Sequence, residues 1–136
     1  MSGMDLRLEL VLVPVSDVDR AKEFYVEKAG FQLDVDSEPG GGLRVVQMTP
    51  PGSACSITIG SSVTDATPGS LRGIHLVTAD LQVARDELVA RGVDVSEYFH
   101  YEAGERLPGL DPDRSRYTSF ASFSDPDGNT WLLQEA

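Results

Sequence analysis

Apolar and polar positions along the chain follow one succession of patterns, and the succession occurs twice. The first round opens with the mostly apolar run 8–15, which predicts a buried strand. Ser16 or Asp17 is expected to cap a helix whose apolar face carries Ala21, Phe24 and Tyr25, and Gly30 is expected to end it. Alternating or apolar segments with turn residues between them then predict three strands, at 31–36, 43–48 and 55–59.

The second round repeats this order after a polar, turn-rich stretch. Residues 74–77 predict a strand, Asp80 is expected to cap a helix, and Gly92 is expected to end that helix. Three further strands are predicted at 93–101, 117–123 and 130–134. The two expected caps, Asp17 and Asp80, stand as far apart along the chain as Ala21 and Ala84 do, which indicates an internal duplication.

The predicted fold class is therefore α+β, with two tandem βαβββ modules in a single domain spanning 1–136. Module one covers about 6–60, the connector covers 61–70, and module two covers about 71–136. The second module carries an insertion at about 102–116, which is interpreted as a long polar loop. Such a loop serves either as a lid or ligand contact or as a surface insertion without a role.

Composition narrows the functions that this fold can have. The 136 residues carry a net charge of −11, which argues against nucleic acid or an anionic membrane as a partner. No apolar run approaches the ~20 residues of a membrane span, and the first residues do not resemble a signal peptide. The single cysteine, Cys55, excludes an internal disulfide framework, so a cytoplasmic protein is expected.

Two motifs carry a family resemblance. Val-Ser-Asp-Val-Asp-Arg-Ala at 15–21 precedes Phe24 and Tyr25, and Asp-Pro-Asp-Gly-Asn at 125–129 precedes an apolar strand. Together with the duplication, they resemble the vicinal oxygen chelate superfamily, which includes glyoxalase I, extradiol dioxygenases and bleomycin-resistance proteins. The resemblance implies sheets that curl around a shared concave cavity, and it implies a homodimer.

The resemblance also implies where a divalent metal would bind. The family's first-strand ligands fall here on Leu10 and Gly73, the last-strand ligand falls on Leu132, and its first-half counterpart falls approximately on Ser56. Leucine and glycine side chains cannot bind a metal, and a lone serine hydroxyl is a poor ligand. We therefore expect no metal site and no cofactor.

Strand alternation identifies the residues expected to line the cavity. His75 shares a face with Gly73, and Leu12, Thr58 and Gln134 share the faces of Leu10, Ser56 and Leu132. His100 lies beside the insertion, and either His100 with Tyr98 or Phe99 with Tyr101 could face inward. The predicted ligand-binding residues are Leu10, Leu12, Thr58, His75, His100, Leu132 and Gln134, with His75 as the catalytic candidate if there is one.

Three functional hypotheses remain open at this point. The first is a metal-free protein of the bleomycin-resistance type that binds a small, cationic or aromatic molecule. The second is a metal-dependent lyase, isomerase or dioxygenase with a displaced site around His75, using His100 and a carboxylate of the insertion. The third is a metal-free acid–base enzyme that uses His75, and His75 could equally be a core residue with no such role.

Overall fold

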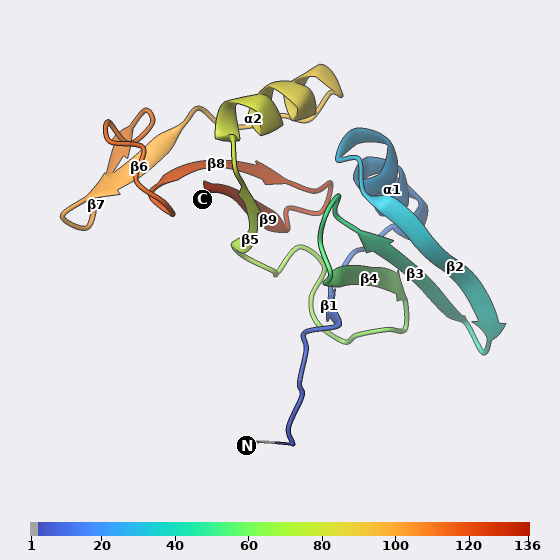
Figure 1. Cartoon of the computed structure of the whole chain (residues 1–136). Coiled ribbons are helices and arrows are strands. Elements are labelled where there is room, and N and C mark those ends of the chain that lie inside the picture. The colour runs from blue at the N-terminus through green and yellow to red at the C-terminus, as the bar shows by residue number, and fades with distance from the viewer. Residues whose placement is uncertain (1–2) are drawn as a thin grey trace.

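Two open, curled β-sheets, each with its own helical segment, make up residues 3–136, which are the residues that the computed structural model describes (Figure 1). The first sheet has the order β1 (Leu10–Leu12), β4 (Ser56–Ser61), β3 (Leu43–Thr49) and β2 (Gln32–Gly40). The second has the order β5 (Ile74–Thr78), β9 (Thr130–Glu135), β8 (Ser119–Ser124), β6 (Phe99–Glu102) and β7 (Glu105–Pro108). In each sheet the strand before the helix pairs in parallel with the last strand of the module. This confirms the predicted tandem βαβββ arrangement.

The two helical segments begin where the sequence predicted, directly after Asp17 and Asp80. Asp17 accepts a hydrogen bond from the Arg20 amide at 3.1 Å and caps α1 (Val18–Glu23). A short π-helical turn, η1 (Phe24–Lys28), continues it. Asp80 caps α2 (Leu81–Ala90) by accepting from the Val83 amide at 3.2 Å. Both helices lie on the same side of the molecule (Figure 1).

The helix-facing sides of the two sheets share one hydrophobic core. Tyr25 and Phe31 of module one lie with ring centroids 5.8 and 5.6 Å from that of Trp131 in module two. Phe24 contacts Phe123 in the same way, at 6.2 Å. Because both helix-facing sides converge on this core, the opposite faces of the sheets lie on the outside of the chain. We call these the outer faces.

The turn between β8 and β9 fastens the modules together through buried polar groups. The Asp125 carboxylate accepts hydrogen bonds from the Tyr25 hydroxyl at 2.7 Å and from the side-chain amide of Asn129 at 2.8 Å. The same Asn129 amide donates to the carbonyl of Pro14 at 2.8 Å. Burial, followed by the neighbouring Asp125 charge, raises the pKa of the Tyr25 hydroxyl, so Tyr25 stays protonated and donates.

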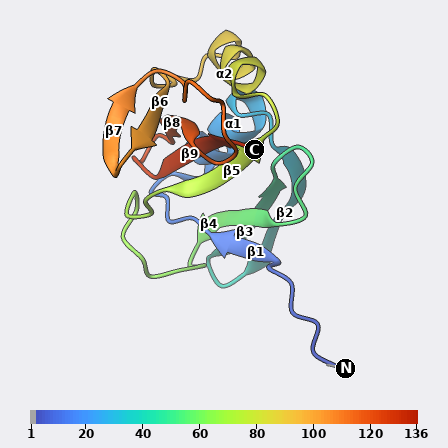
Figure 2. The same cartoon turned by 60° about the vertical axis from the view of Figure 1, so that its left-hand side comes forward.

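The first strand is shorter than predicted. The sequence predicted a buried strand at 8–15, whereas β1 covers only Leu10–Leu12 and Leu8 is 71% exposed. The partner strand β4 begins at Ser56, whose amide bonds the Glu9 carbonyl at 2.9 Å, so earlier residues have no strand beside them. Figure 2 shows this N-terminal segment extending away from the sheets.

The predicted strand 93–101 was wrong in extent, because β6 starts only at Phe99. Before it, the Ser96 amide bonds the Ser122 carbonyl and the Ser96 hydroxyl accepts from the Ser122 amide, which replaces a regular ladder. The insertion is also more ordered than a loop, because residues 105–108 pair with β6 as β7. Ala103 and Gly104 both have positive φ, as a two-residue hairpin turn requires.

Among the helices of residues 3–136, none has the length and hydropathy that crossing a membrane would require.

Candidate functional site

The outer face of the first sheet carries three of the predicted ligand-binding residues. Leu10 pairs with Ser56 and Leu12 pairs with Thr58 across the parallel β1–β4 ladder, so all four side chains share one face. Thr58 is only 4% exposed, and its hydroxyl has no hydrogen-bond partner among the residues that the structure describes. An unpartnered buried hydroxyl is costly, which makes Thr58 a notable member of this face.

The outer face of the second sheet carries three more of them. His75 lies beside Leu132 in the β5–β9 ladder, and Gln134 lies opposite Phe120 in the β9–β8 ladder. His75 is exposed, and its Nδ1 is 2.7 Å from the Gly73 carbonyl oxygen, which orients the ring. The predicted grouping of His75, Leu132 and Gln134 on one face therefore matches the strand register.

Aromatic rings cover the other half of this face, and we call His75, Phe99, Tyr101 and Phe120 the aromatic platform. Phe99 and Phe120 are stacked with centroids 5.5 Å apart, and Tyr101 and His75 meet Phe120 edge-on at 5.7 and 6.3 Å. The Arg106 guanidinium lies over Phe99, 3.7 Å from its centroid. The sequence left open which face of this strand Phe99 and Tyr101 occupy. The β6–β8 register pairs Phe99 with Phe120 and so places both side chains on the outer face.

His100 does not join this face. It pairs with Ser119, on the side of the sheet opposite to Phe120, and it is buried. Its Nδ1 is 2.7 Å from the Gly109 carbonyl and its Nε2 is 3.2 Å from the Glu102 carboxylate. The Gly109 carbonyl, and after it Glu102, raises the pKa of His100. His100 therefore holds the β6–β7 hairpin in place.

A groove of about 450 Å³ lies between the modules, next to the aromatic platform. The turn Pro50–Ser53 borders it on one side, and β5 with α2 borders it on the other. His75 lines this groove and also contacts Phe120, so it connects the groove with the outer face. A concave space of this size, lined by apolar and polar side chains and lying beside exposed rings, has the form of a small-ligand site.

The side chains at the family's metal positions do not fit a metal ion. The register confirms that Leu10 lies beside Ser56 and that His75, the nearest imidazole, lies beside Leu132. Among residues 3–136, no group of three His, Cys, Asp or Glu side chains is placed to hold a metal. His75 and His100 lie on opposite faces of the second sheet, so a displaced site that combines them is not formed. The absence of a cofactor stays a prediction.

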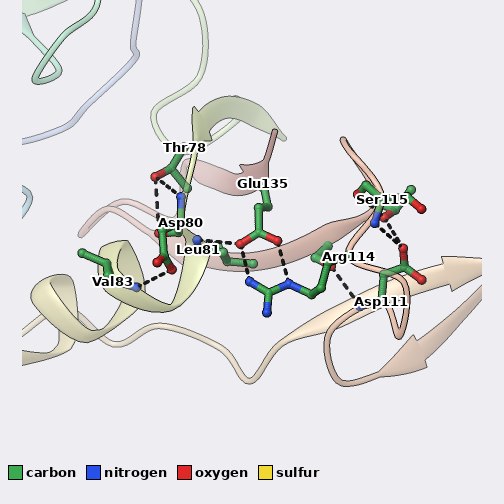
Figure 3. A network of polar contacts seen from close by, with 10 residues as sticks. Thr78, Asp80, Leu81, Val83, Asp111, Arg114, Ser115 and Glu135 are labelled. Atoms are coloured by element: carbon green, nitrogen blue, oxygen red, sulfur yellow. Dashed lines mark hydrogen bonds and ion pairs between the residues drawn. The ribbon is translucent and has the colours of Figure 1, made fainter.

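An ion pair fastens the end of the insertion to the last strand and to α2 (Figure 3). The Glu135 carboxylate accepts two hydrogen bonds from the Arg114 guanidinium, at 2.7 and 2.6 Å, and one from the Leu81 amide at 2.9 Å. In Figure 3, Glu135 lies between the first residue of α2 and the loop that holds Asp111 and Ser115. Arg114, with Leu81 as a further contributor, lowers the pKa of the buried Glu135 carboxyl.

Replacing the Glu135 carboxylate is expected to make the stability of the fold vary less with pH. A lowered folded-state pKa stabilises the fold above the unfolded value of about 4.3, and the stabilisation is lost as the pH falls through the folded value. Glu135→Gln should therefore lower the thermal unfolding midpoint by about 3–6 °C at pH 7. Calorimetry from pH 7 to pH 3 should show this gap closing below about pH 4. A gap that is constant with pH would contradict the assignment.

Comparison with known proteins places this geometry in a family. The family model of the Glyoxalase/Bleomycin resistance protein/Dioxygenase superfamily matches residues 7–133. The chain belongs to this superfamily. It is 36% identical to TnmS3, an antibiotic binding protein from Streptomyces sp. CB03234, with a TM-score of 0.75 over 99% of this chain and 98% of that one.

A second solved member of the superfamily, a glyoxalase/bleomycin resistance protein from the same organism, is 37% identical. Its TM-score is 0.71, over 95% of this chain and 100% of that one. The uncharacterized protein YetH of Bacillus subtilis (strain 168) is 25% identical over 92% of this chain and 94% of its own length. Superfamily membership fixes the scaffold, and because such scaffolds host unrelated functions, the side chains of the site must indicate the function.

Proposed function

We propose that this chain is a binding protein for a small molecule with a planar aromatic part, held against the aromatic platform at the mouth of the inter-module groove. The observation that carries the proposal is the exposure of Tyr101 and His75 beside the stacked pair Phe99 and Phe120. A ring placed edge-on or offset against such a surface gains stacking energy as well as apolar burial. Gln134 lies across from Phe120 and supplies a polar group that orients the ligand.

The comparison with TnmS3 supports binding over catalysis. That protein is an antibiotic binding protein, and it shares 36% of its residues with this chain over nearly the full length of both. The hypothesis of a metal-dependent enzyme that combines His75 with His100 gains no comparable support, because these two side chains lie on opposite faces of the sheet. The net charge of −11 favours a ligand that is neutral or cationic.

The proposal includes a homodimer in the cytoplasm. Leu12 on the first sheet and Val77 on the second leave apolar side chains exposed on the outer faces, and a second copy that contacts these two residues would cover them. Light scattering tests this part, because a dimer has twice the 14.7 kDa mass of the chain and a monomer does not. The cytoplasmic location rests on the single cysteine, and a reporter fusion would test it.

Replacing the exposed ring of the platform is expected to weaken binding. Acridone, a neutral planar fluorophore, should bind the unmodified chain, and Tyr101→Ala should weaken that binding about tenfold through lost stacking and burial. Fluorescence anisotropy titration measures both affinities. Val89→Ala, which removes an exposed apolar side chain on α2, is the matched control and should bind normally. Equal affinities for Tyr101→Ala and the unmodified chain, or no binding of acridone by the latter, would refute the proposal.

A further inference from the structure

The outer face of the first sheet differs from the aromatic platform in its chemistry. Five polar side chains lie next to one another there, and we call them the polar strip: Asp34, Gln47, Thr49, Ser56 and Thr58. Residues paired across adjacent strands point to the same face, so Gln47 shares the face of its partner Thr58 on β4. Thr49, two residues after Gln47 on β3, points to that face as well. A β-bulge between Leu33 and Val35 turns Asp34 toward the same face, where it meets Thr49.

Three members of the strip form a directed hydrogen-bond chain. The Thr49 hydroxyl donates to the Asp34 carboxylate, and the Ser56 hydroxyl oxygen is 2.7 Å from the Thr49 oxygen. Because a hydroxyl has one proton, and that of Thr49 goes to Asp34, the Ser56 hydroxyl must donate to Thr49. The chain thus runs from Ser56 to Asp34, and it leaves lone pairs on the Ser56 oxygen and on the second carboxylate oxygen to accept further bonds.

Thr58 adds an independent observation that a partner is missing. Its hydroxyl is buried and makes no hydrogen bond within residues 3–136. Thr58 lies two residues after Ser56 on β4 and therefore points to the same side of the sheet. Leaving a buried hydroxyl unpaired costs about 1–3 kcal/mol, so a ligand that pairs with it regains this energy.

The charge of the strip is uncompensated. Asp36, two residues further along β2, forms ion pairs with Lys22 at 2.8 Å and Arg44 at 3.1 Å. Asp34 forms none with any cationic side chain of residues 3–136. The strip thus combines one unneutralised carboxylate with hydroxyl oxygens that are free to accept. A group with several donors and a positive charge complements it.

We propose that the polar strip is a subsite for a protonated amine of a small molecule. An ammonium group has three donors and no acceptor, which matches the acceptors on Asp34, Ser56 and Thr58. The inference goes beyond the proposed function, because it concerns a different sheet and a different chemical group. It rests on that function only in taking the amine to be part of a small-molecule ligand.

Two-dimensional ¹H–¹⁵N NMR titration with benzylamine and with benzyl alcohol tests the subsite. Benzylamine should shift the amides of residues 34, 47, 49, 56 and 58 and bind at least about fivefold more tightly than the alcohol, which has the same ring without the charge. Asp34→Asn should abolish this preference. Glu38→Gln, an equal loss of charge at an exposed position of the same strand, should retain it.

Thr58→Val is a second variant that separates binding from folding. It removes the unpartnered hydroxyl at nearly constant volume, so the thermal midpoint should stay the same or rise, while benzylamine affinity should fall at least about threefold. Equal binding of amine and alcohol, shifts confined to other residues, or an unchanged preference in Asp34→Asn would each overturn the subsite. Acridone binding by the unmodified chain tests the proposed function separately, and Asp34→Asn should not change it. If the unmodified chain does not bind acridone but does prefer benzylamine, and Asp34→Asn abolishes that preference, the proposed function is refuted and the subsite stands.

Discussion

Asp125→Ala is expected to destabilise the fold by about 3–5 kcal/mol, because it removes one carboxylate from the centre of a buried network. Asp125 is 5% exposed and accepts four hydrogen bonds. Two come from the backbone amides of Asp127 and Asn129 and shape the turn, and two come from the side chains of Tyr25 and Asn129. Alanine leaves all four donors without this acceptor.

Urea unfolding followed by far-UV circular dichroism measures the loss. Asp127→Ala is the matched control, since it changes an aspartate of the same turn whose carboxylate, within residues 3–136, accepts hydrogen bonds from exposed Ser16 alone. That variant should lose no more than about 1 kcal/mol. Similar losses for the two variants would mean that the buried network contributes little, and would contradict the role assigned to Asp125.

The tandem fold could be predicted from the sequence because individual residues specify where the helices begin and end. Asp17 and Asp80 cap the two helices because an aspartate side chain accepts a hydrogen bond from a backbone amide of the first turn. Gly30 and Gly92 adopt the positive φ that follows the end of each helical segment. The extent of strands depends instead on a neighbour. Leu8 continues the alternation of Leu10 and Leu12 toward the N-terminus, yet the strand starts at Leu10, because its partner β4 starts at Ser56.

The site could be predicted in part for the same reason. Alternation within a strand correctly grouped His75 with Gly73 and Leu132 with Gln134, because it needs no knowledge of the partner strand. The aromatic platform and the polar strip depend on register between strands. Phe99 meets Phe120, and Asp34 reaches Thr49 only through a bulge, and neither contact leaves a signal in sequence spacing. His100 shows the same limit, since its face is set by β8.

Trp131→Ala is expected to lower the stability of the whole chain by about 3–5 kcal/mol, in one unfolding transition. Trp131 is 1% exposed and packs on Phe123 of its own module and on Phe31 and Tyr25 of the other. Its indole N–H also donates to the Tyr25 hydroxyl at 3.0 Å. Alanine leaves a cavity that both modules line and an oxygen that loses its donor, so neither module retains its core.

Calorimetry and urea unfolding followed by circular dichroism measure this effect without relying on tryptophan fluorescence. Leu132→Ala removes the adjacent side chain on the outer face and should cost about 1 kcal/mol, since Leu132 is only half-buried. Two separate transitions in Trp131→Ala, with one at the unmodified midpoint, would show that the modules fold independently. A single lowered transition would show that the shared core makes two copies of one pattern into one cooperative unit.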